Sequence, residues 1–179
     1  MVDGKPVLVI DRFDRDGDWR VGYVSAMTML ESRDGNHGSY LEVGAAIEQH
    51  SPRATDDLRE LWRRIVFTVL ISNTDDHLRN HGFLRTAGSG WTLAPAFDLN
   101  PDPRPGPKQL STAIDETDAT LDLDLALRVA PLFRLDVEQA AEIVEEVRAA
   151  IRGWRTVAGA VGIPEPEIER MAPAFSMSD

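Results

Sequence analysis

Residues 55–84 read TDDLRELWRRIVFTVLISNTDDHLRNHGFL, and this stretch decides the fold of the chain. Apolar side chains recur in its first half at the three- and four-residue spacing of an α-helix with one buried face. They are Leu58, Leu61, Trp62, Ile65, Val66, Val69 and Leu70. Thr55 is the expected N-cap, and Asp56 and Asp57 suit the positive end of the helix dipole. We therefore predict a core helix that begins near Thr55, ends near residues 72–73 and is followed by a polar loop.

A β-hairpin is expected directly after the polar loop. Residues 82–86 and 91–94 are strand-like, and the Ala-Gly-Ser-Gly sequence between them predicts a flexible turn. The next segment carries prolines at positions 101, 103, 105 and 107. Because such a run forbids a helix, we expect an extended surface loop over residues 100–120.

Helices are predicted on both sides of this central region. The expected helices cover residues 25–31, 40–50, 121–133 and 164–171, with a longer one that begins after Asp136. Gln139 stands at the reciprocal capping-box position for Asp136. The chain opens with Val7-Leu8-Val9-Ile10, a β-branched apolar run that predicts a strand buried on both faces. The predicted fold class is mainly α with a small β-hairpin and an N-terminal strand.

The composition excludes several classes of protein. The 179 residues contain no cysteine, which rules out disulfide frameworks, thiolate zinc sites and cysteine nucleophiles. A net charge of −11 argues against a broad grip on nucleic-acid phosphates, so we expect no direct nucleic-acid binding. No stretch approaches the roughly 20 apolar residues of a membrane helix, and no signal peptide is visible. We expect a cytoplasmic location and no membrane contact.

Chemistry-bearing side chains gather between residues 73 and 98. Asp75 and Asn80 have the Asp-x4-Asn spacing of a kinase catalytic loop, and Asp98 follows after an apolar approach. In that arrangement the first Asp accepts the proton of the attacking hydroxyl, while the amide and the later carboxylate bind Mg²⁺. A short motif alone is weak evidence. The alternative is that Asn73, Asp75 or Asn80 satisfies backbone groups of the loop and helix end.

Three strings of sequence resemble one known family. LISNTDDHLRNHGFL at residues 70–84 and WTLAPAFDL at 91–99 look like the C-terminal kinase domain of the HipA family. VIDRFDR at residues 9–15 resembles the family's strand that enters the interlobe hinge. The resemblance runs over nearly the whole chain, including the helix that contains Trp154.

The resemblance implies a bacterial Ser/Thr kinase with Asp75 as catalytic base, Asn80 and Asp98 as Mg²⁺ ligands, and ATP as phosphoryl donor. HipA-like proteins are often toxins paired with a DNA-binding antitoxin, and known family substrates include aminoacyl-tRNA synthetases. The implied partners are therefore a protein substrate and an antitoxin.

The chain departs from the family at its start. The family's Gly-rich loop and phosphate-pairing Lys precede the Arg-Phe-Asp-Arg strand, whereas only eight residues precede that strand here. Lys5, in a turn-like Asp-Gly-Lys-Pro segment, is a poor substitute. We expect a protein-kinase-like C-terminal lobe whose N-terminal lobe is largely missing. Residues 1–24 would form a hinge-like strand and turn, and residues 25–179 a mainly helical lobe.

Further residues have two interpretations each. Arg12 and Phe13 could line the nucleotide cleft, with Phe13 near the adenine, or Phe13 could pack in the core with the arginine exposed. We expect His77 to brace the loop by a hydrogen bond to the backbone of Asp75 or to the segment near Asp98. Arg79 could meet substrate or phosphate, or it could be solvated.

Asp76 is expected to face solvent.

Two other functions stay open beside the kinase. One is a catalytically incomplete module that docks an antitoxin or a separate N-terminal lobe. The other is a metal-dependent phosphohydrolase that uses Asp75, His77, His81 and Asp98, because imidazole and carboxylate ligands suit transition metals.

Overall fold

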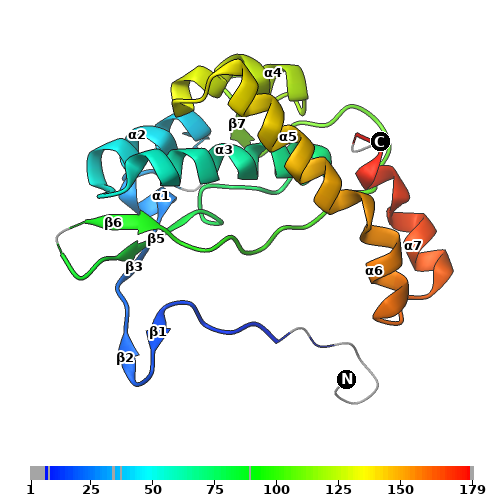
Figure 1. Ribbon diagram of the computed structural model, residues 1–179, viewed down its shortest axis with the longest axis horizontal. Coiled ribbons are helices and arrows are strands. Elements are labelled where there is room, and N and C mark those ends of the chain that lie inside the picture. Colours follow the sequence, from blue (N-terminus) through cyan, green and yellow to red (C-terminus); the bar gives the residue numbers. More distant parts are fainter. Residues whose placement is uncertain (1–6, 8, 34, 37, 89, 178–179) are drawn as a thin grey trace.

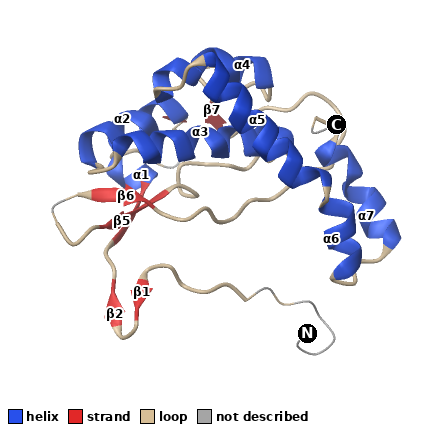
Figure 2. Cartoon of the chain, viewed as in Figure 1, coloured by secondary structure: helices blue, strands red, loops and turns tan. Residues whose placement is uncertain are grey.

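The computed structural model describes residues 7, 9–33, 35–36, 38–88 and 90–177, and it is mostly helical, with small sheets (Figures 1 and 2). The helices are α1 (Ala26–Met29), α2 (Tyr40–His50), α3 (Ala54–Leu70), α4 (Leu123–Val129), α5 (Val137–Arg152), α6 (Trp154–Ala160) and α7 (Glu165–Met171). Two 3₁₀ turns, η1 (Ala130–Phe133) and η2 (Ala172–Phe175), follow α4 and α7. The strands are β1 (Arg15–Asp16), β2 (Trp19–Arg20), β3 (Tyr23–Ser25), β4 (Gly38–Ser39), β5 (Gly82–Arg85), β6 (Trp91–Leu93) and β7 (Thr112–Ala113).

The predicted core helix is confirmed as α3, and it packs against α2, α4 and α5. Its apolar stripe is at most 1% exposed at each predicted position, which places it at the centre of the core. Trp62 is fully buried, and its indole Nε1 donates a hydrogen bond to the carbonyl oxygen of Ala126 at 3.1 Å. A buried Trp with its N–H satisfied therefore ties α3 to α4.

The start of α3 differs from the sequence expectation, because Thr55 lies inside the helix and Arg53 is the N-cap residue. The side chain of Asp57 is buried rather than turned to solvent. Its Oδ2 accepts hydrogen bonds from the hydroxyl of Ser51 at 2.7 Å and the backbone N–H of Leu93 at 2.9 Å. Arg53 Nε lies 3.0 Å from its Oδ1. The first-turn carboxylate thus fastens β6 to the helix.

The predicted hairpin is confirmed as β5 and β6, and β3 joins it to give an antiparallel sheet in the order β3-β5-β6. In Figure 1 this sheet lies below α2. The expected extended segment at 100–120 contains β7, which pairs in parallel with β4 through Gly38–Thr112 and Ser39–Ala113. That pairing draws the segment after the prolines back to the start of α2.

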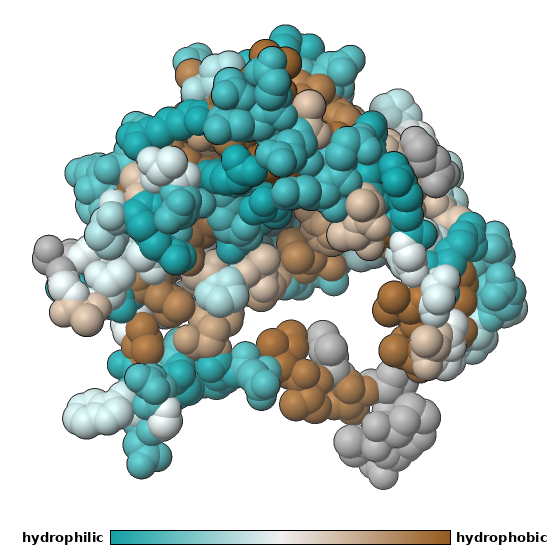
Figure 3. All heavy atoms as spheres, in the orientation of Figure 1, coloured by the Kyte–Doolittle hydropathy of each residue, from teal (hydrophilic) through white to brown (hydrophobic). Residues whose placement is uncertain are grey.

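The predicted buried strand at residues 7–10 is wrong for its described residues. Val7, Val9 and Ile10 have no strand structure and are 52%, 84% and 64% exposed. A two-faced apolar strand forms only where neighbouring strands cover it, and no described strand pairs with this segment. The first strands are β1 and β2, which form a separate hairpin. Figure 3 shows the apolar atoms of the segment separated from the helical body by an open gap.

The C-terminal helices confirm one prediction and correct another. Asp136 and Gln139 form the predicted capping box at the start of α5, with bonds of 2.8 Å and 3.0 Å. The longer helix predicted to begin after Asp136 ends at Arg152, and after Gly153 a separate helix, α6, begins at Trp154. Trp154 is only partly buried and stacks on Phe175 of η2, with a ring-centroid distance of 4.2 Å.

No helix in the described part of the chain is long and apolar enough to cross a membrane.

Candidate active site

The loop after α3 folds back on itself through its own backbone. His77 N–H donates to the carbonyl of Asp75 at 3.0 Å, and Asn80 N–H donates to the carbonyl of His77 at 2.8 Å. The side-chain amide of Asn80 also donates to the Asp75 carbonyl, at 3.2 Å. Two donors therefore meet at one carbonyl, and the Asn80 side chain satisfies a backbone group of the loop, which was the alternative interpretation of this residue.

Asp75 and Asp76 have opposite environments. Asp75 is exposed, whereas Asp76 is 1% exposed, so the expectation that Asp76 faces solvent is wrong. Asp76 Oδ2 accepts hydrogen bonds from the hydroxyls of Tyr40 at 2.5 Å and Thr68 at 3.2 Å, and it lies 3.2 Å from His81 Nε2. These partners lie on α2, on α3 and just before β5. The buried carboxylate therefore anchors the loop to three elements of the core.

The charges in this buried group shift two pKa values in opposite directions. Burial alone would raise the pKa of Asp76, but the nearby His81 and the hydroxyls of Tyr40 and Thr68 hold it below its ordinary value. Burial, and then the negative charge of Asp76, raises the pKa of Tyr40 well above its ordinary value. Tyr40 therefore stays protonated and donates, and Asp76 stays ionised and accepts.

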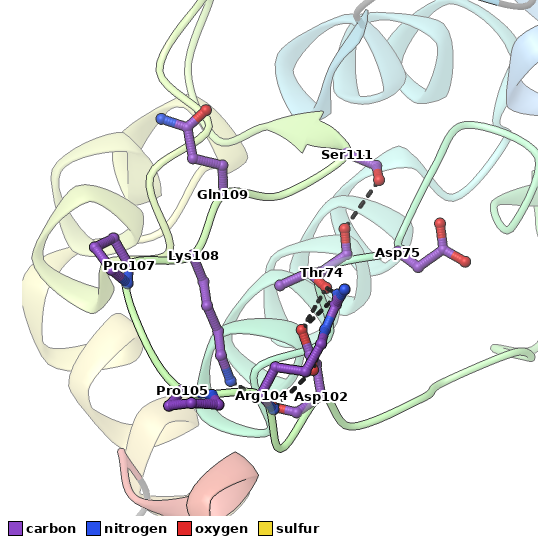
Figure 4. A pocket seen from close by; sticks show the side chains of 9 residues that line it. All are labelled: Thr74, Asp75, Asp102, Arg104, Pro105, Pro107, Lys108, Gln109 and Ser111. Carbon is purple, nitrogen blue, oxygen red and sulfur yellow. Dashed lines mark hydrogen bonds and ion pairs between the residues drawn. The ribbon is translucent and has the colours of Figure 1, made fainter.

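A polar cavity of about 590 Å³ opens beside the exposed carboxylate (Figure 4). It is lined by Thr74, Asp75, Asp102, Arg104, Pro105, Pro107, Lys108, Gln109 and Ser111. One wall is the loop after α3, and the other is the proline-containing segment 102–111. Hydrogen bonds between described residues hold both walls in place, so the cavity is preformed.

Four of these hydrogen bonds join the two walls. The Asp102 N–H donates to the carbonyl of Ser72 at 3.2 Å, and the Thr74 hydroxyl donates to Asp102 Oδ2 at 3.0 Å. Ser111 donates both its N–H, at 3.1 Å, and its hydroxyl, at 2.9 Å, to the carbonyl of Thr74. Sequence reasoning missed this wall, because nothing in the spacing of the prolines indicates where the segment docks.

Asp98 lies on the segment that leads from the hairpin to this wall. It is exposed, and its φ of 59° is in the left-handed region, which is uncommon for a residue other than glycine. Asn100 Nδ2 donates to Asp98 Oδ1 at 2.7 Å. No described hydrogen bond joins Asp98 to Asp75 or Asn80, so the structure brings that pair together and leaves Asp98 on the neighbouring segment. Strained backbone of this kind is often found at functional sites.

A second cavity, of about 340 Å³, is lined by residues 10–14 and by the rings of Tyr23 and Phe97. Phe13 contacts Phe97 at a ring-centroid distance of 5.8 Å and Tyr23 at 6.0 Å. Arg12 also lines this cavity, with its guanidinium hydrogen-bonded to Asp14 at 2.7 Å and 2.5 Å. Arg12 and Phe13, the residues predicted to face the nucleotide, therefore line the same pocket. Phe97, which also lines it, directly precedes Asp98 in the chain.

His77 and Arg79, the predicted supporting residues, have different positions. His77 contacts the backbone of Asp75 through its own backbone N–H rather than through its ring. Its buried Nδ1 makes no hydrogen bond to a described residue. Arg79 is exposed.

The donor set at Asn80 suits a hard cation. Its amide nitrogen is engaged with the Asp75 carbonyl, which leaves the amide oxygen, the atom that Mg²⁺ prefers, free of described hydrogen bonds. Asp75 and Asp98 offer exposed carboxylates nearby in the sequence. By contrast, no cluster of three or more His, Asp or Glu side chains in the described residues could hold a metal ion. The four-ligand site of the phosphohydrolase alternative is therefore not formed.

Comparison with known proteins identifies the family. Residues 1–154 match the model of the HipA-like C-terminal domain, so the chain belongs to that family. A Haemophilus influenzae protein named "Putative kinase" is 32% identical over 101 residues, which are 51% of this chain and 29% of that protein. A Sinorhizobium fredii protein with a similar name is 30% identical over 95 residues, 51% of this chain and 23% of that protein.

The fold also matches a solved structure. A chain from the Shewanella oneidensis toxin–antitoxin complex of HipA, HipB and operator DNA superposes with a TM-score of 0.67 at 19% identity. The match covers 94% of this chain and 46% of that one. The chain thus spans less than a third of the curated relatives and under half of the solved chain.

Proposed function

We propose that this chain is the C-terminal lobe of a HipA-like Ser/Thr kinase that transfers a phosphoryl group from ATP to a protein hydroxyl. The observation that carries the proposal is the exposed carboxylate of Asp75 on the wall of a preformed polar cavity. Asp76, directly after it, is locked into the core, so the loop that presents Asp75 is rigid. A general base needs this combination of access and fixed position.

The roles follow from the two cavities. The aromatic pocket at Phe13 and Phe97 suits an adenine ring, and the polar cavity at Asp75 suits the acceptor. Asp75 would accept the proton as the acceptor oxygen bonds to the γ-phosphorus and the bond to the ADP oxygen breaks. Asn80 and Asp98 would hold Mg²⁺, which would neutralise charge on the phosphates.

The exposed apolar segment Val7, Val9 and Ile10 supports a related proposal about partners. Apolar side chains gathered on one segment mark a contact surface more often than a free one. We infer that the Gly-rich loop and phosphate-pairing Lys come from a second lobe that covers this segment. A HipB-like antitoxin is the further partner we propose, by analogy with the Shewanella complex. A docking module without turnover is the second candidate function that the same segment favours.

The test measures nucleotide binding and transfer separately. The chain, alone and joined to an N-terminal lobe of a family member, is titrated with Mg²⁺ and a non-hydrolysable ATP analogue. We expect Asp98→Ala to lose Mg²⁺-dependent binding, and Asp75→Ala to bind normally but to lose about 10²–10⁴-fold in transfer rate. Asp124→Ala, on the exposed first turn of α4, is the matched control. If the joined protein binds no Mg²⁺-nucleotide, the kinase proposal fails.

A further inference from the structure

Lys108 is the unpaired cation of the polar cavity. Its ammonium donates to the backbone carbonyl of Asp102, and no carboxylate of a described residue forms an ion pair with it. Lys108 is also partly buried, so less water is available to solvate its charge than at an open surface. A partly buried ammonium without a counter-ion is an unsatisfied electrostatic feature.

The other charges of the cavity are already compensated, except that of Asp75. Arg104 donates two hydrogen bonds of 2.8 Å to the Asp102 carboxylate, from Nε to Oδ1 and from Nη2 to Oδ2. This pairing holds the pKa of Asp102 well below its ordinary value, so both charges persist as a neutral unit. Neither Asp75 nor Lys108 forms an ion pair with a described residue, although the charge of Asp75 also acts on Arg104.

These two unpaired charges are separated rather than joined. Figure 4 shows the side chain of Asp75 leaving the backbone on the far side of Thr74 from Lys108. The described residues contain no ion pair between them, although both line the same cavity. A single ligand that satisfied both would extend across Thr74, with a hydrogen-bond donor at one end and an anionic group at the other.

We propose that the cavity is the acceptor subsite of the kinase and that Lys108 selects a peptide segment with a carboxylate close to the acceptor hydroxyl. The hydroxyl would donate to Asp75 while the carboxylate pairs with the ammonium. Pro105 and Pro107 restrict the backbone on either side of Gly106, so the ammonium is presented with little loss of chain entropy. This assignment rests on the proposed kinase function, because it is the kinase reaction that requires a hydroxyl at Asp75.

The experiment measures peptide binding without nucleotide. Three fluorescein-labelled peptides carry one Ser and differ only in the two residues that follow it, which are Glu, Gln or Lys. Fluorescence anisotropy gives the dissociation constant of each for the whole chain at low salt. We expect the Glu peptide to bind about fivefold more tightly than the Gln peptide, as one partly exposed ion pair allows. The Lys peptide should bind most weakly of the three.

The variants separate the charge of Lys108 from other effects. Lys108→Met should abolish the preference for Glu over Gln, and Lys108→Arg should retain it. Lys5→Met, at the one other lysine of the sequence, should leave it unchanged. The inference is overturned if wild type binds the Glu and Gln peptides equally, if it fails to bind the Glu peptide, or if Lys108→Met keeps the preference.

The same preparation distinguishes this inference from the kinase proposal. Binding of the ATP analogue with Mg²⁺ is measured for wild type and Lys108→Met, and we expect equal affinities. If Lys108→Met loses the nucleotide instead, the ammonium serves a phosphate and the acceptor assignment is wrong. If no nucleotide binds even with the N-terminal lobe attached, while the Glu preference depends on Lys108, the kinase proposal alone fails.

Discussion

Asp75 and Asp76 are neighbours in the chain, yet one carboxylate lies exposed on a cavity wall and the other is sealed between α2, α3 and the residue before β5. The peptide unit between them is shared, so the buried residue fixes the backbone of the exposed one. Thr112 adds a further constraint, because its hydroxyl donates to the backbone carbonyl of Asp76 at 2.7 Å. The position of the proposed base is therefore set by groups that do not line the cavity.

The first prediction compares these two neighbours. Asp76→Asn should lower the free energy of unfolding by about 2 kcal/mol, because it weakens buried hydrogen bonds to a charged acceptor. Asp75→Asn should change it by less than about 0.5 kcal/mol, since that side chain is exposed. Urea denaturation of both variants measures the difference. Equal effects would show that Asp76 is not the anchor.

The contribution of Asp76 to the free energy of unfolding should depend on pH in a defined direction. The folded-state pKa of Asp76 is lowered, so its contribution is present above its unfolded pKa of about 3.9. The contribution is lost as the pH falls through the lower folded-state value. The stability gap between wild type and Asp76→Asn should therefore be constant near neutral pH and narrow only in acid.

Tyr40 gives a prediction at alkaline pH. Its folded-state pKa is raised, so the contribution of its hydroxyl is full below the unfolded pKa of about 10 and is lost as the pH rises through the folded value. The phenolate absorbance of the folded chain should therefore appear at a higher pH than that of free tyrosine. Tyr40→Phe should remove the part that appears at the highest pH. Tyr23, the only other tyrosine, is less buried, and partial burial alone raises its pKa, so it gives the part that appears at the lower pH. A normal titration of Tyr40 would contradict its buried contact with Asp76.

Phe13 tests the aromatic pocket. Phe13→Ala removes a ring that contacts Phe97 and Tyr23, and if adenine stacks there it should weaken binding of the Mg²⁺–ATP analogue about tenfold. Trp19→Ala is the matched control, because Trp19 is 80% exposed on the neighbouring hairpin. Calorimetric titration of both variants compares them. Equal affinities for wild type and Phe13→Ala would remove this residue from the nucleotide site.

The capping box at α5 provides a prediction that is independent of function. Asp136→Ala leaves the N–H of Gln139 without its 2.8 Å partner and should cost about 1 kcal/mol of stability. Glu138 lies two residues further on, in the first turn of α5, and is exposed. Glu138→Ala should have a much smaller effect on stability. Thermal unfolding followed by circular dichroism measures both. A cost at Glu138 as large as at Asp136 would contradict the capping role.

The sequence predicted those elements whose signals are local. The α3 stripe, the β5–β6 hairpin and the Asp136 box each depend on residues a few positions apart, and all three are confirmed. The strand predicted at 7–10 was wrong for its described residues, because an apolar run becomes a strand only when distant strands pair with it. The fate of such a run cannot be decided from its own residues.

The candidate site divides in the same way. The five-residue spacing singled out Asp75 and Asn80 in the sequence, and the hydrogen bond between them is local, but the role of either residue stays a prediction. The burial of Asp76 depends on Tyr40, 36 positions earlier, and the cavity wall depends on Asp102 and Ser111. No spacing rule connects these residues, so only the folded chain reveals them.

The bonds between the two cavity walls also determine how the site can open. The amide hydrogens of Asp102 and Ser111 both end on carbonyls of the loop after α3, at Ser72 and Thr74. Neither amide can exchange with solvent unless the proline-containing segment lifts away from that loop. The two amides should therefore exchange hydrogen for deuterium together, with one opening free energy, as a single cooperative unit. Opening of this side of the cavity would then involve the lifting of an entire wall rather than the motion of one side chain.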